Sequence, residues 1–177
     1  MTTSYDLDAA IRKVPDFPKK GILFFDITGI LEQPEAFQYC IDALYDKYKD
    51  KHIDRIACIE ARGFIFGAPL AVKMGVPLVL VRKKGKLPGK THEQSFELEY
   101  GTDTVCIQDV DIREGDNFLV LDDLVATGGT VAAACDIIER NGGTVEAISG
   151  IIGLPFLGYE KVLEPHKVDV LVTYNAE

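Results

Sequence analysis

The chain has 177 residues, of which 47% are hydrophobic, and a formal net charge of -9. This length suits one domain with a sizeable core, and the acidic balance argues against nucleic acid or a membrane surface as a partner, because both would repel the chain. The four cysteines are scattered without a C-x-x-C pair and the N-terminus lacks an apolar stretch, so we expect a cytoplasmic protein without zinc or redox chemistry.

Apolar residues predict an alternation of helices and strands that begins after residue 33. In chain order the predicted elements are a helix at 34–50, a strand at 53–59, a helix at 63–74, strands at 77–81 and 117–121, a helix at 130–141, and strands at 144–152 and 168–172. Fully apolar strands between helices predict an α/β fold with a doubly wound, mainly parallel sheet. Ligands of such sheets bind beyond the carboxyl ends of the strands.

Two segments lie outside this alternation. Residues 1–33 carry Pro15, Pro18 and Gly21, and we expect a small cap over the sheet edge. Residues 83–104 form a polar connection that is too long to be routine, and the alternation of Phe96, Leu98 and Tyr100 with glutamates indicates a mobile hairpin that acts as a lid. Within it, residues 85–91 fall one residue short of a phosphate-binding P-loop and precede a strand-like segment, which disfavours a nucleotide kinase.

Residues 119–130 read Leu-Val-Leu-Asp-Asp-Leu-Val-Ala-Thr-Gly-Gly-Thr. We expect the strand to end at an open polar edge, because Asp122 and Asp123 would otherwise face opposite sides of a buried sheet. Carboxylates accept hydrogen bonds from a ribose diol. The small residues that follow leave backbone N–H groups free to bind a phosphate at a helix N-terminus. The string therefore predicts a ribose 5-phosphate site made by Asp122, Asp123, Ala126, Thr127, Gly128, Gly129 and Thr130.

This string resembles the 5-phosphoribosyl-1-pyrophosphate (PRPP) signature of type I phosphoribosyltransferases. Four further segments, at 24–27, 60–64, 82–89 and 98–101, are similar to the adenine phosphoribosyltransferase family and occur in the family's order. The resemblance covers most of the chain and implies the type I fold as a single domain, with a hood within residues 1–33 and a lid at 83–104. It also implies transfer of the phosphoribosyl group of PRPP to N9 of adenine, a homodimer, and Mg²⁺ held through PRPP and water without a direct protein ligand.

The resemblance assigns roles to individual residues. It implies that Glu99 on the lid is catalytic, beside Tyr100, and that the Glu60-Ala61 peptide is cis. The pyrophosphate-binding residues would be Glu60, Ala61, Arg62, Arg82, Lys83 and Lys86, with Arg82 or Lys86 able to reach across a dimer interface. Adenine would lie against Phe24 and Leu124 and be read by backbone groups of Leu23 and Phe25. The chain departs from the family at Glu60-Ala61, where Asp-Ser is more common, and at Phe25, where arginine is common.

Two alternatives stay open at this point. One is transfer to another base, such as xanthine, hypoxanthine, guanine or orotate; in enzymes for 6-oxopurines an aspartate precedes the signature threonine, whereas this chain has Ala126. The other is a PRPP-sensing regulator without catalysis. Such a regulator needs a DNA-binding module, and the chain has no basic recognition helix and no room for one before its first helix.

Overall fold

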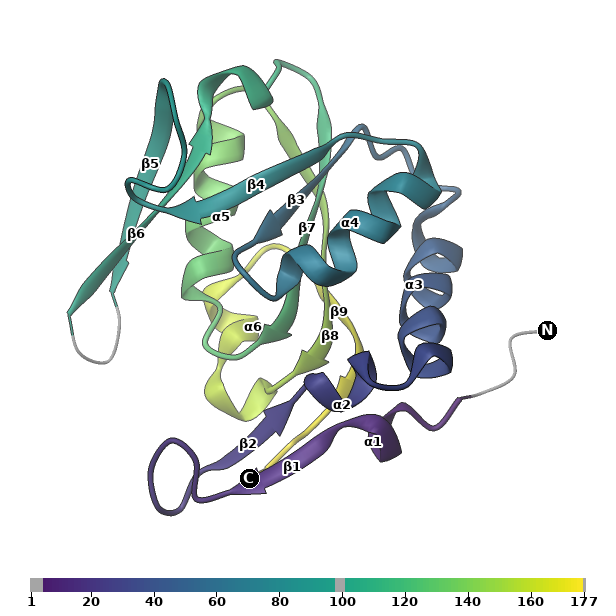
Figure 1. Ribbon diagram of the computed structural model, residues 1–177. Coiled ribbons are helices and arrows are strands. Elements are labelled where there is room, and N and C mark those ends of the chain that lie inside the picture. The colour runs from purple at the N-terminus through teal and green to yellow at the C-terminus, as the bar shows by residue number, and fades with distance from the viewer. Residues whose placement is uncertain (1–4, 98–100, 177) are drawn as a thin grey trace.

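The computed structural model describes residues 5–97 and 101–176. Within these residues, seven strands form the main sheet in the order β5-β6-β4-β3-β7-β8-β9 (Figure 1). The parallel strands are β3 (Arg55–Ile59), β4 (Leu78–Lys83), β7 (Asn117–Val125), β8 (Thr144–Gly153) and β9 (Val168–Thr173). The predicted mainly parallel sheet is therefore confirmed, and each of its predicted strands is present.

Helices cover both faces of this sheet, as a doubly wound fold requires. Helices α3 (Pro34–Tyr48) and α4 (Gly63–Met74) pack in the same hydrophobic cluster as Leu119 and Leu121 of β7. Helix α5 (Gly129–Arg140) packs in a second cluster with Phe118 and Val120. Because neighbouring strand residues point to opposite faces, β7 contributes to both clusters, which explains why its sequence is continuously apolar up to Leu121.

Strand β7 differs from the sequence prediction at its carboxyl end. We expected it to end before Asp122, but it continues to Val125 and pairs there with β8, with Leu124 opposite Ile152 and Val125 opposite Gly153. The two aspartates consequently lie inside the last part of the strand. The physical reason is the backbone ladder to β8, which stabilises an extended conformation that the side chains alone do not indicate.

The predicted hairpin is present and joins the main sheet. Strands β5 (Thr91–Glu97) and β6 (Thr102–Gln108) pair antiparallel, and β6 pairs antiparallel with β4 at Arg82 and Lys83. The hairpin thus forms one edge of the sheet and extends beyond the predicted limit at residue 104, while Leu98, Glu99 and Tyr100 lie outside the described residues. Strand β5 packs along α5, where a Cβ on Gly129 would lie 3.2 Å from Cδ2 of Phe96.

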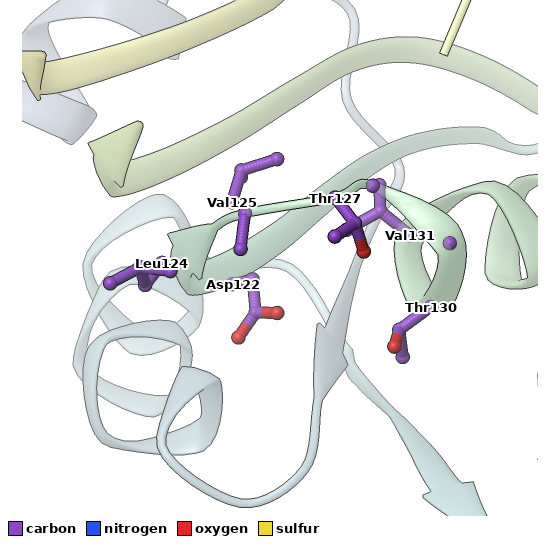
Figure 2. A pocket seen from close by; sticks show the side chains of 9 residues that line it. Asp122, Leu124, Val125, Thr127, Thr130 and Val131 are labelled. Atoms are coloured by element: carbon purple, nitrogen blue, oxygen red, sulfur yellow. The ribbon is translucent and has the colours of Figure 1, made fainter. Parts of the chain in front are cut away.

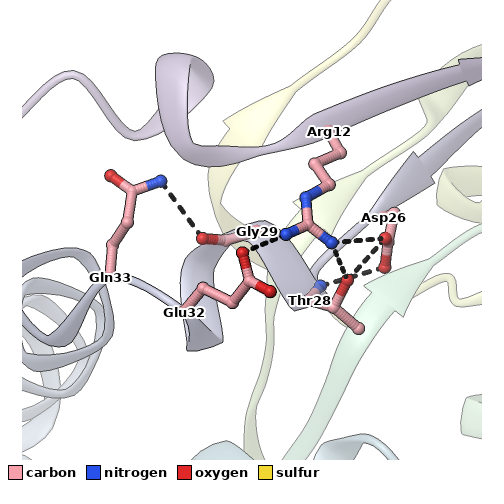
Figure 3. Close-up of polar contacts among 6 residues, drawn as sticks. All are labelled: Arg12, Asp26, Thr28, Gly29, Glu32 and Gln33. Atoms are coloured by element: carbon pink, nitrogen blue, oxygen red, sulfur yellow. Dashed lines mark hydrogen bonds and ion pairs between the residues drawn. The ribbon is translucent and has the colours of Figure 1, made fainter.

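The N-terminal segment, here called the hood, has a two-stranded sheet of its own, and its apolar residues pack in the same cluster as Leu119 and Leu121. It contains α1 (Leu7–Ala10), β1 (Arg12–Pro15), β2 (Leu23–Asp26) and α2 (Thr28–Leu31), and β1 pairs antiparallel with β2. Figure 3 shows its polar contacts: Arg12 donates to Oγ1 of Thr28 at 3.1 Å, lies 3.8 Å from the Asp26 carboxylate and contacts Glu32. Side-chain contacts therefore tie β1 to β2 and α2.

The remaining elements are short. They are the 3-10 helices at Asp109–Asp111 and Pro155–Leu157 and the helix α6 (Tyr159–Val162). Among the described residues, none of the helices has the length and apolar character needed to cross a membrane.

Candidate active site

A cavity of about 490 Å³ opens at the carboxyl ends of the parallel strands. This is the position at which open α/β sheets bind ligands. It brings together eight of the site residues predicted from the sequence, which are Glu60, Ala61, Arg62, Lys83, Asp122, Asp123, Leu124 and Thr130.

A smaller pocket of about 90 Å³ adjoins this cavity and is lined by Asp122 and residues 124–131 (Figure 2). Gly128 precedes α5 with a φ of 84°, a left-handed conformation that favours glycine. Since a glycine has no side chain to cap the helix, the first N–H groups of α5 are left for another acceptor. The pocket therefore has the features of an anion site at a helix N-terminus.

The two adjacent aspartates have different surroundings. The carboxylate of Asp123 is buried, with 3% of the residue exposed, and its Oδ2 lies 2.7 Å from Nε of Arg62 without the alignment of a hydrogen bond. The sequence led us to expect a solvent-facing Asp123, which is wrong, because β7 continues past it and Arg62 covers it. Asp122 faces the smaller pocket, where burial, and secondarily the negative charge of Asp123, raise its pKa well above the ordinary value.

Basic side chains at the cavity are held by acidic partners. Nε of Arg82 donates to Glu60 at 2.7 Å, and its guanidinium also donates to the carbonyl of Lys86 at 3.1 Å. Nζ of Lys83 lies 2.8 Å from Asp103, and this hydrogen bond raises the pKa of Lys83. The peptide between Glu60 and Ala61 is cis, as the resemblance implied. The side chain of Lys86 is exposed.

The hood approaches the cavity through Phe24. Its ring lies 5.9 Å from the guanidinium carbon of Arg62 and packs edge-on against Phe17, with centroids 5.0 Å apart. The next residue points the other way, as strand alternation requires: Phe25 is 3% exposed and its ring stacks on Tyr174. The side chain of Phe25 is thus packed inside the protein, whereas Phe24 faces Arg62.

Sequence reasoning missed four residues that line the cavity. They are Ile59, at the end of β3, and the hairpin residues Phe96, Asp103 and Val105. Asp103 and Val105 alternate along β6, and Val105 lies opposite Lys83 in the ladder with β4. The sequence places Asp103 and Val105 two residues apart, but only the pairing of β6 with β4 identifies the face of β6 that meets the cavity. The predicted catalytic residue, Glu99, and the lid residue Tyr100 lie outside the described part of the chain.

Comparison with known proteins gives matches over most of the chain. The model of the phosphoribosyl transferase domain family matches residues 26–154. An adenine phosphoribosyltransferase of Treponema denticola is 57% identical over 171 residues, which are 97% of this chain and 90% of the relative.

Solved structures agree with this match. An adenine phosphoribosyltransferase from Thermoanaerobacter pseudethanolicus has a TM-score of 0.92 and 44% identity, covering 96% of this chain and 98% of its own. The Saccharomyces cerevisiae adenine phosphoribosyltransferase, solved with an imino-altritol bisphosphate and adenine, has a TM-score of 0.88 and 39% identity over 94% of this chain and 96% of its own.

Proposed function

The chain belongs to the adenine phosphoribosyltransferase family, and we propose that its two adjoining pockets bind PRPP while the hood bounds the adenine site. The reaction is transfer of the 5-phosphoribosyl group of PRPP to N9 of adenine, which gives AMP and pyrophosphate in purine salvage. One observation carries the assignment of the site: an acid pair in β7 leads directly into the uncapped N-terminus of α5.

The sugar and its 5-phosphate belong to the smaller pocket and its rim. We assign the phosphate to the N–H groups of residues 126–130, where the positive end of the α5 dipole favours an anion. The carboxylates of Asp122 and Asp123 are acceptors for the two ribose hydroxyls. Asp123 is then shared between the diol and Arg62, so binding of the sugar and of the pyrophosphate is coupled at this contact.

The pyrophosphate belongs to the larger cavity, beside residues 60–62 and Lys83. As the bond from the anomeric carbon to pyrophosphate breaks, negative charge grows on the leaving group. Fixed cations therefore stabilise the transition state more than the bound substrate. Arg62 and Lys83 are the first candidates for this role. Arg82 adjoins them through its bond to Glu60 and also binds the carbonyl of Lys86, and Arg82 or Lys86 reaches across a homodimer interface.

Magnesium fits the oxygen donors at this cavity. The carboxylates of Asp122 and Asp123 line it, and Mg²⁺ prefers oxygen ligands while keeping much of its water. Asp123 is already paired with Arg62, which suits an ion bound chiefly through PRPP oxygens and water. When bound, the ion supplies positive charge that neutralises the pyrophosphate.

Four buried, unpaired cysteines suit the cytoplasmic location expected from the sequence.

Adenine belongs between the hood and the end of β7. Phe24 and Leu124 supply apolar walls, and backbone groups of Leu23 and Phe25 supply polar contacts that read the edge of the base. Glu99, on the hairpin lid, is assigned the proton transfer at the purine imidazole, and closure of the lid excludes water from the reacting carbon. Ala126 leaves no carboxylate before Thr127, which favours adenine over 6-oxopurines.

Pyrophosphate release tests this assignment. The purified chain is given PRPP and Mg²⁺ with and without adenine, and both pyrophosphate and AMP are quantified. We expect equal amounts of the two products, formed only when adenine is present. Binding of PRPP without release of pyrophosphate would contradict the proposal and favour a regulator that only senses PRPP.

A further inference from the structure

The C-terminal end of the chain contacts the hood through the side chain of Tyr174. It follows β9 directly, and its backbone N–H donates to the carbonyl of Gly153 at 3.0 Å, which extends the pairing of β9 with β8. Its ring stacks on Phe25 with the centroids 3.9 Å apart and the planes 13° from parallel. One residue is thus anchored in the main sheet and packed against strand β2 of the hood.

The contact continues to two other hood elements. The hydroxyl of Tyr174 donates to Oδ1 of Asp8, the residue after the start of α1, and Oδ2 of the same carboxylate pairs with Lys13 at 2.7 Å. The Lys13 ammonium also lies 5.5 Å from the centre of the tyrosine ring and belongs to β1, directly opposite Phe25 in the β1–β2 ladder. Tyr174 therefore contacts α1, β1 and β2 together. Burial, and secondarily the bond to Asp8, raise the pKa of its hydroxyl above the ordinary value.

These contacts are made beside Phe24, the residue of β2 that faces the candidate active site. Phe25 projects into the protein, while Phe24, on the opposite face, reaches the guanidinium of Arg62. Any displacement of Phe25 therefore shifts the Phe24 ring and the backbone groups on either side of it. Phe25 supplies the aromatic ring for this stacking on Tyr174.

We propose that Tyr174 is a positioning residue for the nucleobase: by stacking on Phe25 and bonding to Asp8, it holds β2 against the main sheet and so sets the adenine site. This inference rests on the proposed function, in which β2 reads adenine. The expected consequence is selective. The residues that line the two PRPP pockets come from β3 to β7, from α5 and from the loops that follow β3 and β7, and Tyr174 is not among them, so its loss affects adenine more than PRPP.

Steady-state kinetics on Tyr174→Leu and Tyr174→Phe tests this inference. For Tyr174→Leu we expect KM for adenine to rise by roughly two- to tenfold, the factor that corresponds to a lost aromatic pair, with KM for PRPP unchanged. Tyr174→Phe keeps the stack and is expected to stay closer to the wild type. The matched control is Tyr45→Leu, which removes another half-buried tyrosine with a lysine over its ring, on α3; its two KM values should stay equal to those of the wild type.

A second readout keeps the inference testable if Tyr174→Leu does not fold. Asp8→Ala removes a half-exposed acceptor and is expected to raise KM for adenine in the same selective way, with faster hydrogen exchange at the amides of β1 and β2. Equal changes in both KM values, or no change in a folded Tyr174→Leu or Asp8→Ala protein, would overturn the inference. A wild-type protein that forms no AMP would instead overturn the proposed function, so the two failures are distinct.

Discussion

Replacing Arg62 by methionine tests the contact at which sugar and pyrophosphate binding are coupled. The substitution leaves the Asp123 carboxylate, with 4% of its side chain exposed, without its cation. Leaving a buried polar group unsatisfied costs about 1–3 kcal/mol. The Arg62 side chain is 46% exposed, so screening by solvent keeps the estimate within this range and below the cost of breaking a fully buried pair.

This loss of stability converts into a measurable change. For a domain of this size each kcal/mol lowers Tm by about 2–4 °C, so we expect a loss of about 1–3 kcal/mol in Arg62→Met to lower Tm by roughly 2–12 °C in the absence of ligand. Loss of a fixed cation at the leaving group is expected to lower kcat/KM for PRPP by a factor of about 10²–10³. Differential scanning calorimetry and steady-state kinetics measure the two effects on the same protein preparation.

A double variant separates the two effects. In Arg62→Met/Asp123→Asn the buried group at position 123 is no longer charged, so Tm should recover most of the loss while kcat/KM for PRPP stays low. The control is Arg113→Met, which removes an exposed arginine from the loop before β7 and should change neither quantity. An Arg62→Met protein with wild-type kinetics toward PRPP would refute the reasoning, as would a double variant that recovers activity together with stability.

Three further predictions concern the same site. The raised pKa of Asp122 means that ionisation of its carboxyl destabilises the folded protein as pH rises through that pKa. Asp122→Asn should therefore have a higher Tm than the wild type near neutral pH, and this difference in Tm should shrink toward pH ~4. The same substitution should weaken use of PRPP. A Tm series against pH checks the first effect, and an unchanged Tm at pH 7 would contradict it. Glu99→Leu should lower kcat by a factor of about 10² or more, and a normal kcat would assign the proton transfer to backbone or water. Gly129→Ala places a Cβ 3.2 Å from Phe96 and should raise KM for PRPP. It should not lower Tm, because alanine is favoured over glycine in a helix. An unchanged KM for PRPP would show that the pocket accommodates the added methyl group.

The sequence predicted the sheet because its central strands are buried on both faces. Such strands are apolar along most of their length, and residues 56–59 of β3 are an example that the sequence pattern identifies. The end of β7 was not predictable in this way. Two carboxylates interrupt its apolar run, and the strand continues past them only because β8 supplies hydrogen-bond partners as far as Gly153.

Site residues were predicted from the sequence where they are neighbours in one segment. Site residues were missed where only tertiary contacts bring them to the cavity. The acids and small residues of 122–130 are adjacent in sequence, and the structure places them around adjoining pockets. Asp103 reaches the cavity only through pairing of β6 with β4, and Tyr174 reaches Phe25 only through the docking of the hood on the sheet. Local periodicity contains no information on which distant segments meet.

The most direct test of the account is the base preference of the purified chain. At saturating PRPP and Mg²⁺, kcat/KM is measured for adenine, hypoxanthine, guanine, xanthine and orotate by following pyrophosphate release. We expect kcat/KM for adenine to be well above the value for every other base, because no carboxylate precedes Thr127 and the assigned pocket reads the base through Phe24, Leu124 and backbone groups. A value for hypoxanthine or guanine equal to or above that for adenine would contradict it.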